Sequence, residues 1–312
     1  MKLIFRGAHI CYTLLFLVLV WPYWLGGDVI APHRQLSELA FADKMGAKQM
    51  EKRKFSHFTN GYIPEISEHL NGARSGWLTL WINQSELGRR AYQISGLSPT
   101  YVLTGLLSNG TDSPWKYITI LSLGTCFLAG LFILLFAREA GLSPLSGLIA
   151  GLGLTAFPLF MYWLTFPMLP AVWCWAAGAL WAVTRLAKCP DILGWGVLAF
   201  SGYSLLMTAY PQPVVFNAYL LAGYGLWLAY HQAHVRRLEY AKFLTLAASA
   251  LVVGAALAFP VYRDLFILSS ESARVTPEHS LFTIVLPKLG VICRPAAAML
   301  SQPQEAQFCL QT

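Results

Sequence analysis

Charged residues are missing from five long stretches of the chain: 7–27, 117–137, 140–184, 192–230 and 243–262. A helix needs roughly 20 apolar residues to cross the hydrocarbon core of a bilayer, so the two longest stretches each predict two spans. Prolines within 158–170 and 211–213 mark the breaks, because proline disrupts a helix interior. The pattern therefore predicts seven membrane-spanning helices, at about 8–25, 117–137, 143–162, 168–185, 192–209, 213–230 and 243–262.

These spans predict an all-α, polytopic membrane domain over residues 1–262, interrupted after the first span by a long loop, 28–116. Loops of this length are usually functional when they belong to a compact domain. We expect the loop to be extracytoplasmic and partly helical. We expect the tail, 263–312, to lie against the outer membrane surface and to be the start of a truncated C-terminal half.

Basic residues in the short segments predict the orientation, since cytoplasmic segments carry an excess of Lys and Arg. With the N-terminus inside, all eight of them fall on the cytoplasmic side: Lys2, Arg6, Arg138, Arg185, Lys188, Arg236, Arg237 and Lys242. The expected location is the inner (cytoplasmic) membrane. The basic start and apolar run also fit a cleaved signal peptide, but the interfacial aromatics from Trp21 to Trp24 favour an uncleaved anchor.

Composition agrees with a membrane protein. The chain is 56% hydrophobic and 12% charged, and its mean hydropathy is +0.52, which argues against a soluble globular enzyme and against disorder. The net charge of +7 would suggest nucleic acid in a soluble protein. Because the positive-inside rule accounts for the basic residues of the short segments, we expect no nucleic-acid partner.

The long loop predicts three short helical elements. The first covers about 35–54, the second begins at Pro64 and runs to Gly72, and the third covers Tyr101–Leu107. Proline is favoured at the first helical position, and Ile66 and Leu70 then share one helix face. These elements also fit amphipathic helices that lie on the membrane surface.

The middle of the loop holds the candidate substrate-binding residues. Tryptophans can stack on sugar rings, and arginines can bind a phosphate in bidentate fashion. The same residues also fit interfacial anchors and contacts to anionic headgroups. The candidates are Arg74, Trp77, Trp81, Arg89, Arg90 and Gln93.

Asp28 is the leading candidate for proton transfer. It directly follows Gly26 and Gly27 at the outer end of the first predicted span. Partial desolvation at the membrane boundary would raise its pKa and suit it to act as a general base. Asp28 also fits a simple stop to the hydrophobic segment.

The loop carries Tyr62-Ile63-Pro64, the stretch from Gly76 to Trp81, then Gly88 and Ser98-Pro99. With the topology of 1–262, this pattern resembles the GT-C glycosyltransferases and, more narrowly, the YfhO-like bacterial membrane proteins. The chain differs from the family pattern at His57, where an Asp is common, and at Gly88-Arg89-Arg90, where Gly-x-Pro is expected. It also has fewer predicted spans than most members.

The resemblance implies transfer of a sugar from a polyprenyl-phosphate donor to an acceptor outside the cytoplasm. Asp28 would then be the general base, with Glu65 and Glu86 as the alternatives, and membrane lipid would surround the site. The lipid tail of the donor is expected beside the proline-broken region from Phe157 to Pro170.

Two other functions stay open from the sequence. One is a transporter or flippase, because broken helices are common in transporters, and the other is a truncated, non-catalytic membrane protein. The cysteines show no metal-ligand spacing, so we expect no cofactor, while a divalent cation stays open. Cys293 and Cys309 would both lie outside the cytoplasm, where a disulfide can form.

Overall fold

A computed structural model describes residues 2–30, 63–74, 81–82, 89–90, 98–107, 113–157, 164, 166, 168–208, 211–233 and 237–271. These residues are almost entirely helical, which confirms the predicted all-α class. The first part of the chain contains α1 (Lys2–Leu19), α2 (Trp21–Trp24), α5 (Ile63–Arg74), β1 (Trp81–Ile82), β2 (Arg89–Arg90) and α6 (Pro99–Leu107). The second part contains α7 (Pro114–Ala140), α8 (Pro144–Thr155), α10 (Met168–Lys188), α11 (Ile192–Leu206), α12 (Pro211–Ala233) and α13 (Arg237–Glu271).

The chain forms two compact units, Met1–Ala258 and Phe259–Thr312. Helix α13 continues from the first unit into the second and ends at Glu271. The span predicted at 243–262 is therefore part of a longer helix. The remainder of the predicted tail, 272–312, lies outside the described residues, as does the helix expected over 35–54.

Local sequence explains where α7 begins and ends. Ser113 precedes the helix in an extended conformation, and Pro114 occupies the first helical turn, where its missing N–H is not needed. At the other end, Gly141 adopts φ 80°, a left-handed conformation that glycine adopts without steric cost. The amide of Leu142 then donates to the Ala137 carbonyl at 2.9 Å, which satisfies one of the free carbonyls of the last turn.

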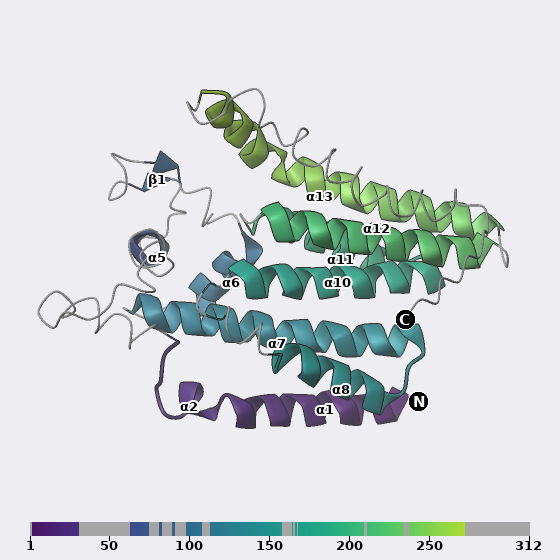
Figure 1. Cartoon of the computed structure of the whole chain (residues 1–312), viewed down its shortest axis with the longest axis horizontal. Helices are drawn as coiled ribbons and strands as arrows, with labels where there is room; N and C mark the ends of the chain where they lie inside the picture. The colour runs from purple at the N-terminus through teal and green to yellow at the C-terminus, as the bar shows by residue number, and fades with distance from the viewer. Residues whose placement is uncertain are drawn as a thin grey trace, which may run out of the picture. The chain divides into compact units, whose positions relative to one another are not determined.

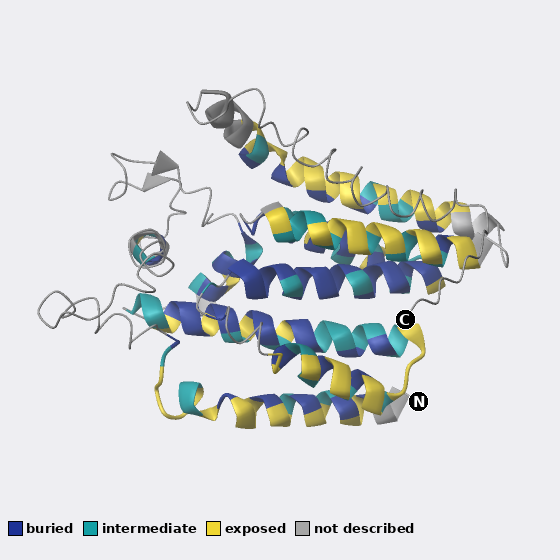
Figure 2. Cartoon of the chain, viewed as in Figure 1, coloured by how far each residue is buried: buried dark blue, intermediate teal, exposed yellow. Residues whose placement is uncertain are grey.

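Within the first unit, α7 and α10 form the centre of a helical bundle (Figure 1). Helix α7 packs against α1, α8 and α10, and α10 packs in turn against α11 and α12. Figure 2 shows α10 buried along most of its length, whereas exposed positions line α1, α8 and α12. Many of the exposed residues are large and apolar: Ile10, Leu14, Val18, Leu145, Ile149, Phe216, Leu220, Leu226 and Trp227.

Glycine allows these helices to approach closely. The ring of Tyr12 on α1 occupies the space beside Gly130 of α7, so that a side chain at residue 130 would overlap it. Helix α8 approaches the same point of α7, because a β-carbon at Gly151 would lie 3.1 Å from the Gly130 carbonyl oxygen. Small residues that let helix backbones approach are typical of helix packing in membranes.

The helix lengths support the predicted spans only in part. In the part of the chain that the structure describes, two helices are long and apolar enough to cross a membrane, Pro114–Ala140 and Ala241–Arg263. Helix α8 has 12 residues, a rise of about 18 Å, and ends at Thr155, seven residues short of the predicted 162. It ends there because a residue before proline, here Phe157 before Pro158, is disfavoured in the helical conformation.

Candidate functional site

Two helices of the long loop pack onto the N-terminal end of α7. Helices α5 and α6 contact each other and α7. They bury an apolar cluster that consists of Ile66, Leu70, Tyr101, Tyr117, Ile118 and Leu121. The Tyr117 hydroxyl donates to the Tyr101 carbonyl at 2.8 Å, which joins α7 to α6 in the interior. The loop therefore contributes packed structure to this end of the bundle, as its length suggested.

His69 of α5 lies within this packed region and is 5% exposed. Its ring meets the ring of Tyr117 edge-on, with the centroids 5.8 Å apart. Burial lowers the pKa of His69, and a backbone interaction with Tyr101 opposes the shift. His69 is not among the candidate residues predicted from the sequence. The available signal was its position three residues after Ile66, which places both on one helix face.

A buried hydrogen bond connects the loop to the centre of the bundle. The indole N–H of Trp175 on α10 donates to the hydroxyl of Thr100 on α6 at 2.7 Å. Trp175 is 4% exposed and Thr100 is 5% exposed, so water does not compete for these groups. This contact fixes the start of α6 against α10.

Asp28 lies at the same end of the bundle as the loop helices. It follows the turn at Gly27, where φ is 74°, and its amide donates to the Pro22 carbonyl at 3.1 Å. Two residues later, the Ile30 amide donates to the Thr119 hydroxyl of α7 at 2.8 Å. Thr119 lies in the first two turns of α7, so this bond holds the Asp28 segment at the same end of α7 as the apolar cluster. Ile30 itself packs with Tyr12, Phe16 and Val20 of the neighbouring core. The Asp28 side chain is exposed in the structure.

The other candidate residues are described only in part. Glu65 and Arg74 lie in α5. Trp81 of β1 is paired with Arg90 of β2, and Ile82 is paired with Arg89, in an antiparallel register. This pairing brings two predicted substrate-binding positions, Trp81 and Arg90, opposite each other along the backbone. The candidates outside the described residues are Trp77, Glu86 and Gln93.

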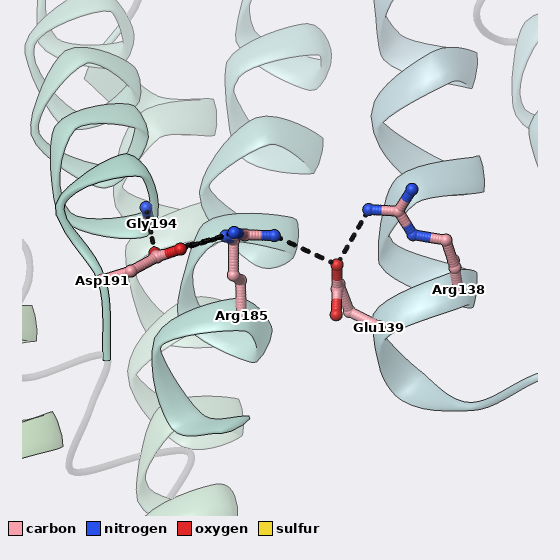
Figure 3. Close-up of polar contacts among 5 residues, drawn as sticks. All are labelled: Arg138, Glu139, Arg185, Asp191 and Gly194. Carbon is pink, nitrogen blue, oxygen red and sulfur yellow. Dashed lines mark hydrogen bonds and ion pairs between the residues drawn. The ribbon is translucent and has the colours of Figure 1, made fainter. Parts of the chain in front are cut away.

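A network of charged residues lies at the opposite end of α7 and α10 (Figure 3). Arg185 of α10 donates through Nε to Asp191 at 3.0 Å and through Nη1 to Glu139 of α7 at 3.4 Å. Arg138 donates to the same Glu139 oxygen at 2.9 Å. Asp191 also accepts from the Gly194 amide at 2.8 Å, which makes it the N-cap of α11.

These contacts account for the charge state of Asp191. The hydrogen bonds from Arg185 lower the pKa of this carboxyl group, and the Gly194 amide adds to the effect, because both stabilise the ionised form. From the sequence, Arg138 and Arg185 predicted only the orientation of the chain. Their joint role in holding α7, α10 and α11 together depends on side chains that meet only in the fold.

An apolar groove of about 460 Å³ runs between α10, α11, α12 and the first part of α13. Its lining is almost entirely aliphatic and includes Val183, Leu205, Ala218, Leu221, Ala247 and Leu251. The lipid-tail groove was expected beside Phe157–Pro170, of which the structure describes only a part. The groove between α10 and α13 is a different place.

No metal centre is found in the described ranges, where no three His, Cys, Asp or Glu side chains are grouped to hold an ion. The cysteines described there, Cys11, Cys126, Cys174 and Cys189, are free thiols. Cys293 and Cys309 lie outside those ranges. The chain matches no protein-family model, no curated protein and no solved structure.

Proposed function

We propose that this chain is a polytopic membrane protein with about seven spans and a cytoplasmic N-terminus. Support comes from the apolar residues exposed on the outer helices, such as Leu14, Ile149 and Leu220, which are 59%, 62% and 61% exposed. Such side chains on several helices of one bundle are unfavourable in water and favourable in lipid. The two helices long enough to cross a bilayer support the same proposal.

The distribution of charge supports the orientation. Arg138, Arg185 and Lys188 lie at the C-terminal ends of α7 and α10, and Arg6 lies near the N-terminus of α1. Arg6, Arg138 and Arg185 line one cavity, so these ends are close together. An end rich in arginine is expected on the cytoplasmic side. The N-terminal end of α7, with the loop helices and Asp28, would then face outward.

We further propose that the outer end carries a GT-C-like glycosyltransferase site that uses a polyprenyl-phosphate sugar donor. The observation that supports it best is the hydrogen bond from Ile30 to Thr119, which holds the exposed Asp28 segment at the end of α7 onto which the loop helices pack. A carboxylate there is open to an acceptor hydroxyl and close to the membrane boundary. Asp28 would act as the general base.

The remaining residues of the proposed site have distinct roles. Arg89 and Arg90 would bind the donor phosphate, with Arg74 available nearby in the sequence, and Trp77 and Trp81 would stack on sugar rings. The pairing of Trp81 with Arg90 supports a shared role for these two strands. The apolar groove along α10 to α13 would hold the isoprenoid chain of the donor, because it offers aliphatic surface open to the bilayer.

The test is consumption of a panel of polyprenyl-phosphate sugars by the purified full chain and by three variants. Loss of a general base costs roughly 10²–10⁴ in rate, so Asp28→Asn should nearly abolish turnover while donor binding stays unchanged. Arg90→Ala should weaken donor binding by roughly 1.5–3 kcal/mol, the cost of a charge-assisted hydrogen bond. Asp112→Asn, another acid of the loop, is the matched control and should have no effect.

Three results would contradict the proposal. Absence of donor consumption by the wild-type chain would remove the enzymatic function and leave a transporter or a non-catalytic protein. Full turnover by Asp28→Asn would move the base to Glu65 or Glu86. Unchanged donor affinity in Arg90→Ala would indicate that this arginine contacts headgroups instead.

A further inference from the structure

The arginine-rich end of the bundle contains a cavity of about 860 Å³. Its lining comes from three helices that are far apart in the sequence. Helix α1 contributes Phe5, Arg6, His9 and Ile10, α7 contributes Arg138 and Glu139, and α10 contributes Arg185. The cavity is therefore built by the packing of the bundle and not by one flexible segment.

The guanidinium groups around this cavity differ in how fully they are paired. Arg185 is paired with two carboxylates, since its Nε and Nη2 atoms bind Asp191 and its Nη1 atom binds Glu139. Arg138 shares the same Glu139 oxygen and keeps further donors open, with its side chain 36% exposed. No ion pair joins Arg6 to a carboxylate in the part of the chain that the structure describes. Three arginines thus face two carboxylates, and Arg6 carries the unpaired charge.

His9 adds a further polar group to the lining. Its Nδ1 atom lies 2.6 Å from the Phe5 carbonyl oxygen and donates to it. Its Nε2 atom is buried and has no hydrogen-bond partner within the described ranges. A buried ring nitrogen without a partner is costly. Because Nδ1 carries the proton of the neutral ring, Nε2 is an acceptor, and the hydroxyl of a protonated phosphate or of a glycerol headgroup would satisfy it.

We propose that this cavity binds a phosphate group, carried either by an anionic lipid headgroup or by a free phosphate. Arginine is suited to this role because its planar fork of N–H donors matches the geometry of phosphate oxygens. Arg6 and Arg138 supply the open donors, and Glu139 and Asp191 hold Arg185 in place beside them. Phe5 and Ile10 give the lining an apolar part, which fits the glycerol and upper acyl region of a lipid. This site is separate from the proposed glycosyltransferase site and does not depend on it.

The experiment uses the purified full chain in a neutral detergent, with two probes. Inorganic phosphate is titrated by calorimetry, and phosphatidylglycerol is compared with phosphatidylcholine by native mass spectrometry. The variant is Arg6→Gln, and the matched control is Lys188→Gln, which removes one positive charge from the same end but outside the cavity. Arg6 is exposed and has no ion pair to a described carboxylate, so its replacement should leave the melting temperature unchanged.

We expect the wild-type chain to bind at least one of the two probes, and Arg6→Gln to weaken that binding about tenfold or more, as loss of a charge-assisted hydrogen bond requires. Lys188→Gln should bind like the wild type. Binding of phosphatidylglycerol alone identifies a lipid headgroup, binding of inorganic phosphate alone identifies a free phosphate, and binding of both identifies a general phosphate site. Binding of neither probe, or equal losses in Arg6→Gln and Lys188→Gln, overturns the proposal.

Discussion

The ring of Tyr12 lies against Gly130, in the space that any larger residue at position 130 would fill. Tyr12 is fully buried, and its hydroxyl donates to the Phe127 carbonyl at 3.1 Å, one turn before Gly130 on the same helix. The ring also stacks on Phe127, with centroids 5.6 Å apart. Tyr12 and Gly130 thus meet at a close contact between α1 and α7, next to the packing of Phe16 on Phe127.

We therefore predict that Gly130→Ala destabilises the protein by about 1–3 kcal/mol, the usual cost of overpacking a filled interior. The methyl group must displace the Tyr12 ring and break its hydrogen bond to Phe127. Thermal unfolding in detergent measures the effect.

Gly124→Ala is the control, because a β-carbon at this exposed position of α7 meets nothing within 4 Å. It should be neutral or slightly stabilising, since alanine favours the helix. Equal effects of the two substitutions would contradict the proposed contact.

The ends of α7 could be predicted from the sequence, whereas its contact with Tyr12 could not. The limits of α7 follow from Ser113-Pro114 and Gly141, which are local signals, so the prediction of 117–137 was close to the observed Pro114–Ala140. Nothing local pairs Tyr12 with Gly130, because the two residues meet only when α1 packs on α7. The early end of α8 was missed because hydropathy continues through Phe157 while the proline after it ends the helix.

The candidate site was predictable to a lesser degree. The sequence placed Asp28 just after a first span at 8–25, whereas α1 ends at Leu19 and the short helix α2 separates it from Asp28. It also placed Trp81 and Arg90 in one short stretch. It could not predict that Ile30 binds Thr119, or that His69 and Thr100 are buried against α7 and α10. Those contacts depend on how the loop helices pack, which hydrophobic periodicity alone does not determine.

The hydrogen bond between Thr100 and Trp175 predicts that the loop and the bundle stabilise each other. Thr100→Val keeps the shape of the side chain but leaves the buried indole N–H unpaired, so it should cost about 1–3 kcal/mol. In a double-mutant cycle with Trp175→Phe, we expect a coupling energy of about 0.5–3 kcal/mol. Thr104→Val is the control, because its hydroxyl donates only to the Thr100 carbonyl of its own helix. A coupling near zero would show that the two side chains do not interact.

Asp191 has two separable functions, and two substitutions distinguish them. Asp191→Ala removes both the cap of α11 and the partner of Arg185, and it should cost about 1–2 kcal/mol. Asp191→Asn keeps a capping oxygen and loses the charge, and it should cost less than about 1 kcal/mol because the ion pair is partly exposed. Thermal unfolding at neutral pH measures both, and an equal loss in the two variants would mean that the cap contributes nothing.

The ion pair of Asp191 also predicts a pH dependence. Hydrogen bonds from Arg185 lower the pKa of Asp191 in the folded state below its unfolded value of about 3.9. The ion pair therefore stabilises the fold fully above that value, and the stabilisation is lost as the pH falls through the lower, folded pKa. The difference in stability between the wild type and Asp191→Asn should be constant from pH 7 to pH 5 and should shrink below pH 4. A difference that grows in acid would contradict this assignment.

The central claim is that the loop with Asp28 and the arginine-rich end with Arg185 lie on opposite sides of a membrane. Reporter fusions after Gly110 and after Lys188 test this topology most directly. One reporter is alkaline phosphatase, which is active outside the cytoplasm, and the other is green fluorescent protein, which fluoresces inside. We predict phosphatase activity only for the fusion after Gly110 and fluorescence only for the fusion after Lys188. The same reporter active at both positions would contradict the topology and, with it, the proposed glycosyltransferase site.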